Sequence, residues 1–60
     1  MTTRYRAVRK DGSAWLTPAG FPTTDPNEAA TFDGASAAIL HVLRSPVQHS
    51  AWTWEATEAP

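Results

Sequence analysis

The sequence predicts a small α+β domain, with three or four antiparallel strands in one sheet and one main helix packed on a face of that sheet. An Asp-Gly pair between two strand-like runs predicts a β-hairpin first, because the turn needs the positive φ that Gly adopts freely. An alanine-rich run over 34–44 has apolar residues at helical spacing. An aromatic run over 51–55 alternates like a strand. The predicted order is two strands, a short turn or strand, a helix and a last strand.

Size limits the architecture to one domain. A chain of 60 residues buries only about 60% of the surface that its unfolded form exposes. There is no cysteine, so no disulfide can compensate, and three tryptophans are the expected substitute. We expect one compact domain over 1–55 and a disordered tail over 56–60.

The hairpin takes its strands from 4–9 and 13–17. In the first strand, Tyr5, Ala7 and Arg9 point to one side, and the residues between them point to the other. Pro18 ends the second strand. Residues 18–24 contain two prolines and a glycine and are predicted to form a loop. Phe21 in this loop either covers the edge of the core or stands exposed as an anchor for a partner.

The middle of the chain carries two helix-start patterns. Asp25 can cap a short helical turn over 26–30, with Pro26 at its first position and Glu28 reaching back to the cap amide. Residues 31–32 either add a short strand or bury Phe32. Asp33 is then predicted to cap the main helix.

The main helix is predicted over 34–44 and ends before Pro46. Its apolar side chains are expected on one face, which packs on the sheet. That face comprises Ala35, Ala38, Ile39, Val42 and Leu43, widened by Ala37 and Leu40. The side chains expected elsewhere are Ser36, His41 and Arg44.

Alternation in the last strand places Trp52 and Trp54 on the same face. If that face points inward, the two rings form the core. If it points outward, they form an exposed apolar patch of the kind that marks an interaction site. We expect this strand to join the sheet beside the first one.

Positive charge is concentrated at the N-terminus. Residues 1–10 carry four basic side chains, and residues 11–60 carry one basic side chain against six acidic ones, which gives the net charge of -1. The basic strand is either a soluble strand face or an electrostatic footprint for a partner.

No catalytic, metal or cofactor site is expected. The only histidines, His41 and His49, have no cysteine beside them and no repeated ligand spacing. Ser45 lies four residues after His41 but lacks an acidic residue to orient the pair, and it is better explained as a helix-end residue. There is neither an apolar run long enough for a membrane span nor a signal-peptide pattern, so a cytoplasmic protein is expected.

The run Tyr5-Arg6-Ala7-Val8, Gly12, Trp15-Leu16-Thr17 and then residues 28–33 before an alanine-rich helix resembles a diffuse class of small phage and prophage proteins. The order over residues 4–44 is also similar to the arm-binding domains of phage-type integrases, although the second and third strands here lack their basic residues. The first resemblance implies a stoichiometric inhibitor or adaptor of host machinery, including defence systems such as CRISPR complexes.

We therefore expect a non-catalytic module that binds a larger protein or protein complex and blocks it sterically. The alternative is a nucleic-acid-binding domain that uses the basic strand, and a homodimer is possible. The residues expected to contact the partner are Arg4, Tyr5, Arg6, Arg9, Phe21, Trp52 and Trp54.

Overall fold

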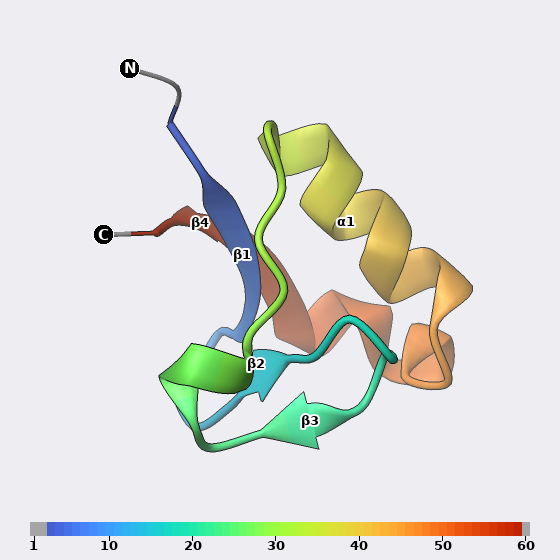
Figure 1. The fold of residues 1–60 in the computed structure, drawn as a ribbon. Coiled ribbons are helices and arrows are strands. Elements are labelled where there is room, and N and C mark those ends of the chain that lie inside the picture. The colour runs from blue at the N-terminus through green and yellow to red at the C-terminus, as the bar shows by residue number, and fades with distance from the viewer. Residues whose placement is uncertain (1–2, 60) are drawn as a thin grey trace.

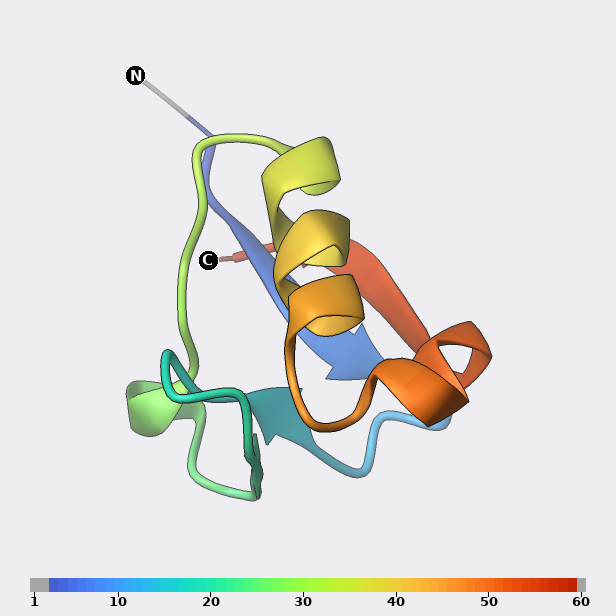
Figure 2. The same ribbon diagram turned by 90° about the vertical axis from the view of Figure 1, so that its right-hand side faces the viewer.

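A computed structural model describes residues 3–59. Four strands form one antiparallel sheet in the order β3-β2-β1-β4. The helix α1 covers one face of that sheet (Figures 1 and 2). The elements in chain order are β1 (Tyr5–Arg9), β2 (Trp15–Leu16), β3 (Pro22–Thr23), the 3-10 turn η1 (Pro26–Glu28), α1 (Ala35–Arg44), the 3-10 segment η2 (Gln48–Thr53) and β4 (Trp54–Glu58). The predicted α+β class is confirmed.

The predicted hairpin joins β1 to β2, with Val8 opposite Trp15. Gly12 has a φ of 77°, and its N–H donates to the Arg9 carbonyl over 2.8 Å. The second strand is shorter than the predicted 13–17, because only Trp15–Leu16 has the ladder geometry.

The segment predicted as a loop contains the edge strand β3. Thr17 N–H donates to the Phe21 carbonyl, and Phe21 N–H donates to the Thr17 hydroxyl, so the chain turns tightly before Pro22. Gly20 in this turn has a φ of 91° and packs against Ser45 at the end of α1. Proline fits here because an edge strand leaves its outward N–H position unpaired.

Asp25 caps η1 as predicted, by accepting a hydrogen bond from Asn27 N–H over 2.9 Å. The turn ends at Glu28, two residues before the predicted end. The Glu28 carboxylate accepts a hydrogen bond from the Thr23 hydroxyl rather than from the cap amide. Phe32 exchanges two 2.8 Å backbone hydrogen bonds with Tyr5 and forms a single β-bridge instead of a strand.

The predicted cap of α1 is wrong. Gly34 occupies the cap position, and no side chain caps the helix there. Asp33 instead forms an ion pair with Arg4, which also donates to Thr31. The Arg4–Asp33 ion pair links the start of β1 to the segment before α1.

The buried face of α1 is rotated from the predicted one. Ala38 and Val42 are buried, but Ile39, Leu40 and Leu43 are 36%, 44% and 49% exposed. His41, predicted to face away, is half-buried. Its ring centroid lies 5.2 Å from that of Phe32, and its Nε2 lies 2.9 Å from the Thr17 carbonyl oxygen. The polar contact turns this side of the helix inward, which a pattern of apolar residues does not predict.

The core lies between α1 and the sheet. Because residues directly opposite each other share a face of an antiparallel sheet, Ala7, Ala56 and Trp54 point toward α1, while Arg6, Val8 and Glu55 point to the open face. The buried cluster comprises Ala7, Ala14, Leu16, Val42 and Trp54.

The last strand joins the sheet beside β1, as predicted, but it begins at Trp54 and not at Ala51. Residues 48–53 form η2, in which the hydroxyls of Ser50 and Thr53 donate to carbonyls three residues earlier. The strand then continues to Glu58, so residues 56–58 of the predicted disordered tail pair with β1. Residue 60 of that tail lies outside the described residues.

Over residues 3–59, no helix has both the length and the apolar character that crossing a membrane requires.

Candidate functional site

The two tryptophans predicted to act together are separated by the fold. Trp52 belongs to η2 and is 76% exposed, whereas Trp54 is 3% exposed. The prediction of a shared face is wrong, because the chain changes from 3-10 geometry to strand between the two rings. Trp54 is a core residue and has no surface for a partner.

The basic residues of β1 also diverge. Arg4 is held by Asp33 and Thr31. Arg6 lies half-buried on the open face of the sheet, and its Nε is buried without a hydrogen-bond partner among residues 3–59. Arg9 lies on the other face, with its guanidinium carbon 5.5 Å from the centroid of a Trp54 ring. The strand therefore does not present one continuous row of free cations.

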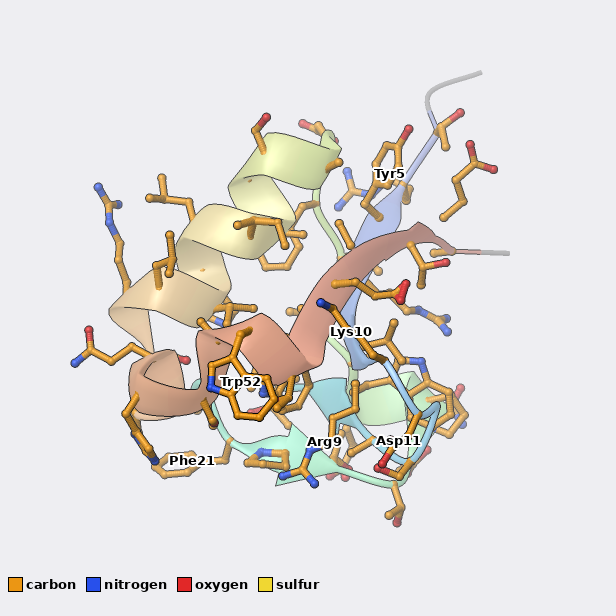
Figure 3. All side chains as sticks on the ribbon, turned by 180° about the vertical axis from the view of Figure 1, so that it is seen from behind. Tyr5, Arg9, Lys10, Asp11, Phe21 and Trp52 are labelled. Carbon is orange, nitrogen blue, oxygen red and sulfur yellow. The ribbon has the colours of Figure 1, made fainter. Side chains whose placement is uncertain are left out.

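A shallow groove lies where the hairpin turn meets η2, and we call it the Trp52 groove. Its volume is about 440 Å³. It is lined by Arg9, Lys10, Asp11, Ser50, Trp52 and Thr53. Figure 3 shows Trp52 on η2 and Lys10 and Asp11 on the neighbouring turn. An apolar ring beside two cations can bind a segment that carries both an apolar and an acidic group.

Backbone hydrogen bonds join the two walls of the Trp52 groove and fix the hairpin wall. Lys10 N–H donates to the Thr53 carbonyl over 2.9 Å, and Arg9 N–H donates to the Ala14 carbonyl over 2.9 Å. On the other wall, Ser50 breaks the helical geometry of η2 with φ -124° and ψ 27°. Trp52 follows this kink, and Trp54 N–H closes the segment on the Ala51 carbonyl.

Asp11 is the acidic group of the groove. Its Oδ1 accepts a hydrogen bond from Ser13 N–H over 2.9 Å. Hydrogen bonding to the Ser13 side chain, its backbone bond and the nearby Arg9 charge lower the pKa of Asp11 below its ordinary value. The carboxylate is therefore ionised at neutral pH and balances part of the local positive charge.

The other two predicted contact residues lie apart from the groove lining. Phe21 is 56% exposed and lies immediately before β3, at the end of the β2–β3 connection. Tyr5 is half-buried at the far end of β1, beside Phe32. A role for either in contacting a partner stays a prediction.

Four residues that line the Trp52 groove were not predicted from the sequence: Lys10, Asp11, Ser50 and Thr53. The pairing of the first and last strands was predicted, and a correct register would have placed Lys10 opposite Thr53. Among the described residues, no group of three or more His, Cys, Asp or Glu side chains is placed to hold a metal ion. The chain matches no protein-family model, no curated protein and no solved structure.

Proposed function

We propose that this chain is a non-catalytic protein-binding module that acts by occupying a site on a larger protein. The observation that carries the proposal is the 76% exposure of Trp52 beside Arg9 and Lys10. A tryptophan left in water does not stabilise the core, and tryptophan and arginine are the residues most enriched in binding hot spots.

The mechanism is steric and needs no rearrangement of the module. Trp52 sits on a segment fixed by side-chain and backbone hydrogen bonds, so docking its ring loses little conformational entropy. Arg9 and Lys10 beside it favour approach to an acidic patch, because opposite charges accelerate encounter and fix orientation.

The resemblance to small phage and prophage proteins extends the proposal to a stoichiometric inhibitor or adaptor of a larger host complex, such as a defence system. This extension is supported only by the sequence resemblance. The Trp52 groove supports only the binding module itself.

Binding to a nucleic acid is the competing interpretation, since an exposed ring beside two cations can also stack on a base and neutralise phosphates. The separation of the β1 cations favours a protein instead. Arg4 is engaged by Asp33, and Arg6 and Arg9 lie on opposite faces of the sheet. A strand lying along a phosphate backbone would need these charges on one side.

The test is affinity capture from a host lysate, with and without nuclease, using immobilised wild type beside Trp52→Ala. The matched control is Leu40→Ala, which removes another exposed apolar side chain. We expect one stoichiometric protein that survives nuclease, is retained by Leu40→Ala and binds Trp52→Ala about 30-fold more weakly, as losing a hot spot of about 2 kcal/mol requires.

Capture that disappears with nuclease would support the nucleic-acid interpretation and overturn ours. Capture of the same protein equally well by Trp52→Ala would show that the Trp52 groove is not the contact surface.

A further inference from the structure

The outer edge of β4 exposes unpaired backbone groups. In an antiparallel ladder, alternate residues direct both N–H and C=O toward the same neighbour. Lys10 N–H bonds to Thr53 O, and Ala59 N–H bonds to Arg4 O. By alternation, Trp54, Ala56 and Glu58 direct their backbone groups away from β1. Among the described residues β4 pairs with β1 alone, so its other edge has no neighbouring strand.

Most of these outward groups are available. Trp54 N–H is already used by the Ala51 carbonyl. What remains on the edge is the carbonyl of Trp54 and both backbone groups of Ala56 and Glu58. Such a row of groups is a template for one more strand.

One apolar side of α1 faces the same edge of the sheet. His41 points to the side of the helix that contacts Phe32 and Thr17. At 100° per residue, Ala35, Ile39 and Leu43 lie on the opposite side. Figure 2 shows β4 on that side of α1, away from the segment before the helix. A hollow of about 380 Å³ runs along it, lined by Ala35, Ser36, Ile39, Leu40 and Leu43.

We propose that a second copy of this chain binds here, by antiparallel pairing of β4 with β4 about a two-fold axis at Ala56. The interface is isologous, so the apolar side of each α1 meets the same side of its copy. Four backbone hydrogen bonds form: Ala56 N–H donates to the Ala56 carbonyl of the second copy, Glu58 N–H donates to its Trp54 carbonyl, and the symmetry repeats both.

The register is self-complementary, which agrees with a second copy as the occupant. Centring on Ala56 pairs the whole of β4 with the whole of its copy and places Glu55 opposite Thr57 of the second copy. Trp54 then lies opposite Glu58 of the second copy. No two carboxylates stand directly opposite each other, which is the arrangement that destabilises cross-strand pairs.

The spacing of the helices agrees as well. α1 packs on both β1 and β4, so its axis lies above the gap between them. With strands about 4.8 Å apart, the two helix axes come within about 10 Å of each other across the two-fold axis. That is the usual distance for packed helices, and it buries Ile39 and Leu43 between the two copies.

The test is sedimentation equilibrium of the whole chain from micromolar to about millimolar concentration. We expect a mass that rises from 6.5 kDa toward twice that value. Ile39→Lys and Ala56→Pro should each weaken the dimer at least tenfold. The proline removes an outward N–H and leaves the pairing with β1 intact. Circular dichroism should show that both variants stay folded.

The matched control is Ala37→Lys, which introduces the same charge on the same helix at an exposed position outside the hollow. Ala37 is one helical turn before His41 and so lies on the side of α1 away from Ile39 and Leu43, and this variant should dimerise like wild type. Amide exchange adds a residue-level measurement: Ala56 N–H should become protected as concentration rises, while Lys10 N–H is protected throughout because it is bonded to Thr53.

A mass of 6.5 kDa throughout would overturn the proposal. So would a dimer that Ile39→Lys and Ala56→Pro leave intact, or one that Ala37→Lys weakens equally. The inference does not rest on the proposed function, because mass is measured without the partner and partner capture is measured with Trp52→Ala.

Discussion

Trp52 and Trp54 are two residues apart and have opposite surroundings. Trp54 is enclosed by the sheet and α1, in the same buried cluster as Leu16 and Val42, and Trp52 projects into solvent from η2. Arg9 lies between the two, over the Trp54 ring on one side and along the Trp52 groove on the other. The exposure of an aromatic side chain therefore depends on which element holds it, and one turn of 3-10 helix is enough to separate core from surface.

Replacing Trp54 should lower the stability of the fold far more than replacing Trp52. Trp54→Ala should lower the free energy of unfolding by about 3–5 kcal/mol, since it leaves a cavity under α1, and Trp52→Ala should change it by less than about 0.5 kcal/mol. Urea unfolding monitored by circular dichroism measures both. Similar losses for the two variants would contradict the contrast between the rings.

A smaller effect tests which ring Arg9 supports. A double-mutant cycle of Arg9→Ala with Trp54→Leu, which removes the aromatic face, should give a coupling energy of about 0.5–1 kcal/mol, as expected for an exposed cation over an aromatic face. The same cycle with Trp52→Ala serves as the control and should give no coupling in unfolding. Coupling to Trp52 alone would contradict the contact between Arg9 and Trp54.

The smallest effect concerns Asp11, whose folded-state pKa is lowered chiefly by its hydrogen bond to Ser13. A carboxyl with a depressed folded-state pKa stabilises the fold above its unfolded-state pKa and loses that contribution as pH falls through the folded-state value. Wild type should therefore be slightly more stable than Asp11→Asn at pH 6, and the difference should shrink as pH falls below the ordinary pKa of 3.8 and disappear below the folded-state pKa. Thermal unfolding of both proteins from pH 6 to pH 2 measures this, and a difference that grows toward low pH would contradict it.

The sequence predicted the parts of the fold that local chemistry determines. Asp11-Gly12 specifies the hairpin, Pro46 limits the helix, and alternation identifies a last strand. The start of that strand was placed three residues early, because Ser50 and Thr53 bond back to carbonyls and hold Trp52 in a 3-10 segment. The spacing of apolar residues does not predict hydrogen bonds of this kind.

The candidate site was predictable only in part. Arg9 and Trp52 were expected contacts and line the Trp52 groove, but Trp54 is buried and Arg4 is engaged by Asp33. Both differences arise from long-range contacts. The burial of Trp54 depends on α1 and β1, and the Arg4–Asp33 ion pair depends on the Tyr5–Phe32 bridge that brings the two segments together.

The pairing of β1 with β4 also bears on how the chain folds. Residues 5–9 find their partners at 54–58, so the ladder that completes the sheet closes a loop of almost the whole chain. Folding rates fall as contacts become more distant in sequence, because the entropy of closing the loop must be lost before the contacts form. The β1–β2 hairpin can form early and alone, but the core around Trp54 can form only when the two ends of the chain meet.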